Sequence, residues 1–201
     1  MTARQLKQEA GSREKLIEAT IELMSVHGFE SMGVSAILEK SGVTKSNFYY
    51  HFKSKEELSL AALDAMSEVF FKEIIEPVLC DRSVSPDRRL ENLFNRMHLK
   101  MQESCCNKGC PFVNLAAETS DFRPSFRAKI DAHFAHYQEL IADCYREGVE
   151  RGIFRKELTP EQAANLILSV MNGTVVQAKV QKDPAIIESN IKATMALFTA
   201  R

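Results

Sequence analysis

The sequence predicts an all-α protein of about nine helices, with a smaller N-terminal and a larger C-terminal domain. Apolar residues recur at i, i+3 and i+4 along most of the 201 residues, which is the spacing of one helix face. No segment shows the alternation of a half-buried strand. Only eight Gly and six Pro are present, and so few turn-forming residues favour long helices.

The first predicted helix covers residues 13–27. Gly28 is expected to end it in a left-handed C-cap, and Phe29 to fold back onto the core. Residues 1–11 are polar and are expected to be disordered or loosely helical. The basic residues near this end are expected to be solvated, or alternatively to reach DNA phosphates as an arm: Arg4, Lys7 and Arg13.

Residues 34–55 predict two short helices with a tight turn between them, followed by the start of a third. Val34, Ile37 and Leu38 form the apolar face of the first helix, and Gly42 supplies its C-cap. Thr44 or Ser46 can cap the second helix, residues 45–51. This arrangement is that of a helix-turn-helix, whose second helix reads DNA.

The second helix has an unusual run of rings, from Phe48 to Phe52. A helix of about two turns has one inward face, so some of these five side chains must face outward. Residues 41–55 also carry three lysines, one histidine and no acid. Asn, Lys and hydroxyl side chains suit the bases and phosphates of a major groove. The basicity is local, because the whole chain has a net charge of -1.

These residues resemble the helix-turn-helix motif of the TetR family of transcriptional repressors. The matching positions are Ile37, Ser41-Gly42-Val43-Thr44, Phe48-Tyr49, His51-Phe52, Ser54-Lys55 and Leu58. The chain departs from the family pattern at Gly33, where a capping hydroxyl is usual and Ser35 is expected to replace it, and at Leu38, where a small residue is usual.

The resemblance implies a homodimer that binds a palindromic double-stranded operator. It also implies a DNA-binding domain at residues 1–55 and an effector-sensing and dimerisation domain at residues 56–201. Thr44, Tyr49 and Lys55 are expected at phosphates. The full set of predicted DNA-binding residues is Thr44, Lys45, Ser46, Asn47, Tyr49, Tyr50, His51 and Lys55.

Six further helices follow from apolar stripes and from Pro at helix starts. They are expected at residues 55–79, 86–104, 111–118, 124–151 and 160–182, with a last helix that starts near residue 184. The resemblance implies that the last two pair with those of a second subunit, although a single apolar stripe also fits packing within one chain.

The stretch around Cys105, Cys106 and Cys110 is the second informative segment. Cys110 precedes Pro111 at the start of a predicted helix, where helix amides are expected to acidify the thiol and Lys108 to add to the effect. Together with Leu115, Glu118, Gly173 and Gln177, this segment resembles an electrophile- and oxidant-sensing branch of the same family. That resemblance implies a sensor thiol at Cys110 and a thiolate-stabilising partner at Lys179.

Three alternatives to a sensor thiol stay open. Free cysteines are often simply buried. A metal site of His98 with the three clustered cysteines is disfavoured because no CxxC pair exists. A pocket for an apolar small molecule is the alternative sensor. Its predicted lining is Phe94, Met97, Met101, Phe112, Phe134 and Tyr137.

Other classes of protein are disfavoured. No GxSxG, HExxH, phosphate-loop or dinucleotide motif indicates an enzyme, and no cofactor is expected. A structural interaction module would leave the outward aromatic, basic helix unexplained. The odd count of five Cys disfavours a disulfide framework. No apolar run of about 18 residues predicts a membrane span, and no signal-peptide core is visible, so a cytoplasmic location is expected.

Overall fold

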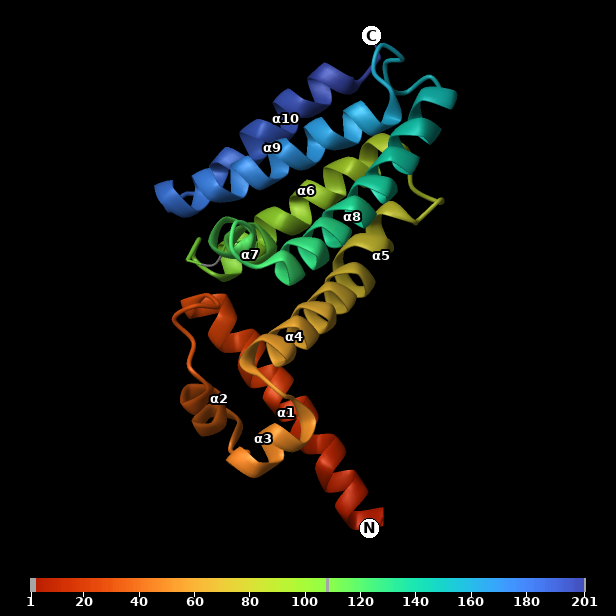
Figure 1. Ribbon diagram of the computed structural model, residues 1–201. Coiled ribbons are helices and arrows are strands. Elements are labelled where there is room, and N and C mark those ends of the chain that lie inside the picture. Colours follow the sequence, from red (N-terminus) through yellow and green to blue (C-terminus); the bar gives the residue numbers. More distant parts are fainter. Residues whose placement is uncertain (1–2, 108, 201) are drawn as a thin grey trace. The chain divides into compact units, whose positions relative to one another are not determined.

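The computed structural model describes residues 3–107 and 109–200, with the backbone alone for residues 3–10. The elements are α1 (Ala3–His27), α2 (Val34–Ser41), α3 (Lys45–His51), α4 (Lys55–Phe70), the π-helix η1 (Phe71–Ile75), α5 (Glu76–Leu79), α6 (Pro86–Glu103), α7 (Pro111–Thr119), α8 (Pro124–Glu150), α9 (Pro160–Gln181) and α10 (Ala185–Phe198) (Figure 1).

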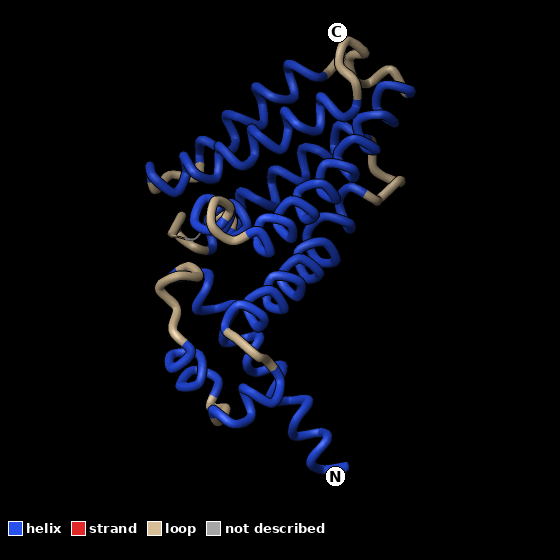
Figure 2. The backbone as a smooth tube through the Cα atoms, viewed as in Figure 1, coloured by secondary structure: helices blue, strands red, loops and turns tan. Residues whose placement is uncertain are grey.

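The described residues form nine helices when the unbroken run α4–η1–α5 is counted as one, which confirms the predicted all-α class. Short loops join the helices (Figure 2). Within the described residues no strand forms, and one isolated bridge pairs Phe154 with Thr199. No helix among those residues has both the length and the apolar character needed to cross a bilayer.

The chain divides into two compact units. The first contains residues 1–68 and 114–130, and the second contains residues 69–113 and 131–201. The first unit therefore combines the N-terminal helices with the end of α7 and the start of α8. Beyond residue 55, where the sequence suggested a functional boundary, this unit also takes in residues 56–68 and one segment distant in sequence, residues 114–130.

The first unit is built on α1, which packs against both α2 and α3 (Figure 1). Its core includes Leu16 of α1, Ile37 of α2, Phe48 of α3 and Leu58 of α4, none of which has any exposed surface. Each of these positions lies on an apolar face that the sequence predicts. The first helix begins at Ala3 rather than near residue 13, because Gly11 and Ser12 lie inside α1 instead of ending it.

The second unit packs α9 and α10 side by side along α6 (Figure 1). Thr159 and Gln162 form a reciprocal capping box at the start of α9, before the Pro that the sequence marks as a helix start. The continuous helix from Lys55 contains a π-turn that the sequence did not predict, in which the amide of Glu76 donates to the carbonyl of Phe71.

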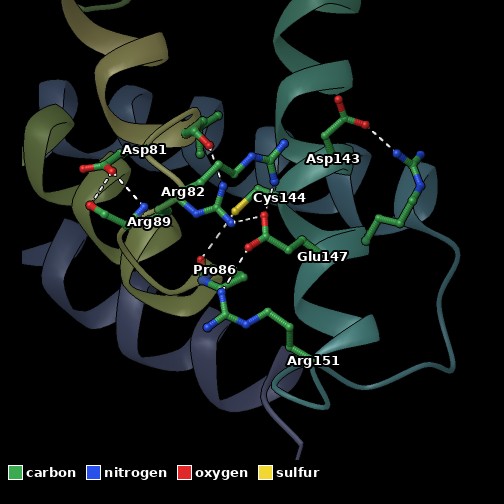
Figure 3. Close-up of polar contacts among 11 residues, drawn as sticks. Asp81, Arg82, Pro86, Arg89, Asp143, Cys144, Glu147 and Arg151 are labelled. Atoms are coloured by element: carbon green, nitrogen blue, oxygen red, sulfur yellow. Dashed lines mark hydrogen bonds and ion pairs between the residues drawn. The ribbon is translucent and has the colours of Figure 1, made fainter.

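A buried arginine joins α6 to α8 in the second unit (Figure 3). Arg89 has no exposed surface, and its guanidinium donates to the carbonyl of Leu79 at 2.8 Å and to the carboxylate of Glu147. Arg82 and Arg151 also donate to Glu147. Burial raises the pKa of Glu147, but these hydrogen bonds outweigh it and lower the pKa to about 2. The carboxylate therefore stays ionised and neutralises the buried arginine.

Candidate nucleic-acid interface and cysteine site

The turn between α2 and α3 has the geometry that its sequence predicts. Gly42 adopts φ 65° and donates its amide to the carbonyl of Leu38 at 3.0 Å, which ends α2 in a left-handed cap. Val43 is buried. The Thr44 hydroxyl accepts from the amide of Asn47 at 3.3 Å and caps α3. Ser35 does not take over capping of α2, because Gly33 is its N-cap and no side chain bonds there.

The aromatic run of α3 divides between the two faces of the helix. Phe48 and Phe52 are buried, whereas Tyr49 and Tyr50 are 54% and 63% exposed. This confirms that the helix cannot bury all of its rings. Lys45 and Ser46 are exposed beside the two tyrosines, and Asn47 is half-buried. The outward face of α3 thus presents an ammonium, hydroxyls and an amide next to two rings, which are groups that can bind bases and phosphates.

Two of the predicted DNA-binding residues, Lys55 and His51, contact other side chains or the backbone of the same unit. Lys55 donates its ammonium to the carbonyl of Phe29 at 2.9 Å and lies 4.1 Å from the centre of the Phe29 ring. His51 is half-buried, its ring meets that of Tyr50 edge-on at 4.9 Å, and its Nε2 atom is enclosed. The Lys55–Phe29 contact has no local sequence signal, because the two residues are 26 positions apart.

A cluster that the sequence did not predict holds the chain just after α1. The two oxygens of Glu118, on α7, accept from the amides of Phe29 at 3.0 Å and Glu30 at 2.9 Å. Arg123 forms an ion pair with Glu30 at 2.9 Å, and its guanidinium lies 5.0 Å from the centre of the Phe29 ring. We call residues 28–30 the corner. All of these residues belong to the first unit.

The cysteine segment corrects one expectation. The backbone amides of Val113 and Phe112 do act to lower the pKa of Cys110, as its place before α7 predicts. However, burial of the thiol outweighs both hydrogen bonds and raises the pKa of Cys110 above its ordinary value. The thiol is therefore less acidic than a free cysteine, contrary to the prediction. Lys108, which was expected to contribute, lies outside the described residues.

The other cysteines have varied surroundings, and all five are free thiols. Cys144 is buried and donates to the carbonyl of Pro86 at 3.5 Å, and burial raises its pKa to about 12. Cys106 is also buried, whereas Cys80 and Cys105 are exposed. Lys179 is half-buried near the end of α9, and no hydrogen bond between described residues joins it to Cys110.

The predicted pocket residues lie in the packed interior of the second unit. Phe94, Met101, Phe112 and Tyr137 are buried, and Met97 and Phe134 are half-buried. The buried His133 stacks on Phe112, with ring centres 3.5 Å apart and an angle of 9° between the planes.

Burial, with a smaller contribution from His136, lowers the pKa of His133 to about 4. The ring is therefore neutral at pH 7. Within the described residues, no three His, Cys, Asp or Glu side chains come together in a way that could hold a metal ion.

Comparison with known protein families agrees with this geometry. Residues 16–62 match the family described as bacterial regulatory proteins of the tetR family. Residues 86–194 match the family described as the tetracyclin repressor-like C-terminal domain. The two matches cover more than half of the chain, including both the α2–α3 segment and the cysteine segment.

Individual relatives are regulators of transcription. An HTH-type transcriptional regulator in the lacX 3' region of Lactococcus lactis subsp. lactis is 28% identical over 93% of both chains. NemR, an HTH-type transcriptional repressor of Escherichia coli (strain K12), is 26% identical over 94% of this chain and 98% of its own. The crystal structure of the reduced form of E. coli NemR matches 93% of this chain and 97% of its own, with a TM-score of 0.83 and 23% identity.

Proposed function

Because the chain belongs to the TetR family of bacterial regulatory proteins, we propose that it is a dimeric repressor that leaves its operator when Cys110 is modified by an electrophile or oxidant. At the coarser level it is a TetR-type DNA-binding transcriptional repressor. The proposal adds the identity of the reader side chains, the dimer interface and the chemistry of release. We expect the protein to act in the cytoplasm, where it would meet its operator DNA.

The exposed face of α3 is the observation that carries the DNA-binding part. Lys45, Ser46, Asn47 and Tyr50 are proposed to contact bases, and Thr44 and Tyr49 to contact phosphates, because these side chains are exposed or half-exposed on one short helix. Lys55 has two N–H donors left after its bond to Phe29, and these are proposed for a phosphate. His51 is half-buried, and its ring atoms other than the enclosed Nε2 are proposed to contact the DNA.

Apolar side chains on α9 and α10 support a homodimer. Leu166, Val176 and Val180 of α9 and Leu197 of α10 are exposed in the single chain, at 45% or more of their surface. A second copy packed on this face would remove them from water. The resulting two-fold symmetry would place two α3 helices on the two halves of a palindromic operator.

The thiol part is supported by the position of Cys110 directly before α7 and by the similarity to the repressor NemR, whose solved structure is described as a reduced form. With a Michael acceptor, the Cys110 sulfur would form an S–C bond at the β-carbon as the C=C π bond breaks, and the thiol proton would be delivered to the α-carbon. With a peroxide, an S–O bond would form as the O–O bond breaks and water leaves, giving a sulfenic acid. Lys179 is the amine proposed to stabilise the thiolate.

An apolar effector is the alternative, and the raised pKa of Cys110 favours it. A thiol that is mostly protonated at neutral pH reacts slowly. Phe94, Met101, Phe112 and Tyr137 instead offer apolar surface in the same unit, with Met97 and Phe134 at its edge. A small apolar molecule that binds better to the DNA-incompetent state would also release the operator.

One experiment separates these mechanisms. The operator is first selected from random DNA, and its affinity for the dimer is measured by fluorescence anisotropy before and after treatment with N-ethylmaleimide. We expect treatment to weaken binding by at least tenfold in the parent and not in Cys110→Ser. The modification rate should rise about tenfold from pH 7 to pH 8, because the thiolate fraction rises tenfold per unit below the pKa.

Cys105→Ser is the matched control, since Cys105 is exposed and lies five positions away. It should respond to the reagent as the parent does. A Cys110→Ser protein that still releases the operator on treatment would remove the thiol mechanism and leave the apolar effector.

A further inference from the structure

The corner after α1 has a geometry that only a few residues can support. Gly28 adopts φ 77° and donates its amide to the carbonyl of Met24, which ends α1. A Cβ atom at Gly28 would lie 2.5 Å from one carboxylate oxygen of Glu118. Glycine is therefore needed both for the backbone angle and for the close approach of that carboxylate.

Glu118 supplies the partners that the corner's backbone lacks. The amides of Phe29 and Glu30 lie beyond the last turn of α1 and have no helical acceptor, and each binds one oxygen of the Glu118 carboxylate. A carboxylate near the C-terminus of a helix is mildly unfavourable to that helix, because the helix dipole is negative there. The acidic residue at this position of α7 is thus explained by the corner and not by α7.

The side chains of the corner are held as firmly as its backbone. Phe29 is 1% exposed and packs on Phe126 of α8 with ring centres 4.6 Å apart. Arg123 bridges Glu30 and Glu56, with its closest contacts at 2.9 Å and 3.4 Å. Residues from α4, α7 and α8 therefore converge on three residues of the chain.

The corner leads directly to the reader. Val34, the first residue of α2, follows Glu30 by four positions, and α1 packs on both α2 and α3. A shift of the corner would move the helix-turn-helix relative to α1. We propose that Glu118 is a positioning residue for operator binding, whose carboxylate fixes the corner and so holds α2 and α3 in the DNA-binding geometry.

The proposal has a second step, which rests on the proposed role of Cys110. Cys110 directly precedes Pro111, the first residue of α7, and Glu118 lies one residue before the C-terminal end of the same nine-residue helix. Modification of the sulfur would change how the start of α7 is capped. Because a helix of this length moves as a stiff rod, that change would also act on the carboxylate at its other end.

The sign of one substitution tests the first step. Glu118→Gln keeps the size of the side chain but removes its charge and one acceptor. Neutralising a carboxylate near DNA normally strengthens binding. Loss of the clamp, meaning the two hydrogen bonds from the amides of Phe29 and Glu30 to the Glu118 carboxylate, should instead weaken it. We expect operator affinity to fall about tenfold, the loss expected when charge-assisted hydrogen bonds are removed. The salt dependence of binding should not change, because no phosphate contact is lost.

Asp121→Asn is the charge-matched control, because it removes an exposed carboxylate three residues away. It should leave the affinity within twofold of the parent. Glu118→Asp keeps the charge on a shorter arm and should fall between the parent and Glu118→Gln, which provides a test if the glutamine variant does not fold. An intact Glu118→Gln or Glu118→Asp dimer that binds as tightly as the parent would overturn the proposal.

Hydrogen exchange of the Phe29 and Glu30 amides separates the two steps. Both amides should exchange faster in Glu118→Gln. They should also exchange faster in the parent after treatment with N-ethylmaleimide, and not in treated Cys110→Ser. If the reagent releases the operator without changing these amides, the link through α7 is wrong while the thiol mechanism stands. If the reagent has no effect but Glu118→Gln weakens binding, the clamp stands without the thiol.

Discussion

Two helices in this chain start beside side chains of similar size in different surroundings. Thr44 caps α3 with a hydroxyl that is exposed to water, whereas Cys110 directly precedes α7 and is half-buried. Around the exposed cap, Lys45 and Ser46 are also exposed and can meet a ligand in solution. At Cys110, burial disfavours the charged thiolate even though the amides of Val113 and Phe112 favour it. Helix position therefore predicts which hydrogen bonds form, whereas burial decides the charge.

The largest expected effect comes from removing the buried ring that anchors α3, the helix with the exposed cap. Phe48 has no exposed surface and fixes α3 to the rest of its unit. Phe48→Ala should lower the free energy of unfolding by about 3–5 kcal/mol, because it removes a large buried ring and leaves a cavity. Urea unfolding followed by circular dichroism measures this. Tyr50→Ala, in the same helix but exposed, should change the unfolding free energy by less than about 0.5 kcal/mol.

The second prediction concerns His133, whose buried ring stacks on Phe112 of α7. The folded protein holds the pKa of His133 near 4, below its ordinary value of 6.5. The unfolded chain therefore binds more protons between those values, so His133 should lower stability as the pH falls from 6.5 to 4. The slope attributable to this residue approaches about 1.4 kcal/mol per pH unit.

His133→Phe keeps the ring stacked on Phe112 and should remove that slope, as measured by urea unfolding at several pH values. His27→Phe, at an exposed position, is the control. A His133→Phe protein with the pH dependence of the parent would show that the buried ring is not responsible.

The smallest expected effect is a loss of operator affinity when an exposed side chain of α3 is removed. Tyr49→Ala removes a ring that is 54% exposed on α3. We expect operator affinity to fall about tenfold, with the dimer and its unfolding free energy unchanged, since one contact to DNA is commonly worth about 1–3 kcal/mol. Anisotropy with labelled operator and sedimentation of the dimer measure the two properties. Equal affinity for the variant and the parent would remove Tyr49 from the reader.

Local rules predicted much of the fold. The left-handed Gly42, the Thr44 cap and the Thr159–Pro160 helix start all depend on residues within four positions of one another. α1 starts earlier than the sequence predicts, because Gly11 and Ser12 resemble a helix boundary although α1 continues through them. The π-turn at Phe71 was not predicted, because its residues fit an ordinary helix equally well.

The candidate sites are harder to predict where they depend on contacts between residues that lie far apart in the sequence. The exposed face of α3 follows from its own seven residues. The clamp at the corner joins Phe29 to Glu118 across 89 positions, so no local pattern reveals it. The acidity of Cys110 differs from the prediction for a related reason. The amides that lower its pKa are its neighbours in sequence, whereas the burial that raises it comes from the surrounding fold.

The π-turn has one further consequence for the helix that contains it. A π-turn accommodates one residue more than the α-helix around it, so residues 71–75 behave as a one-residue insertion. Each residue of an α-helix turns the next by about 100°. Deleting one residue from this segment would convert it to a regular α-turn and leave Val78 and Leu79, both buried, facing the core. Deleting one residue from a regular α-turn of the same helix would instead rotate them by about 100°. We therefore expect a one-residue deletion to be better tolerated within residues 71–75 than within α4.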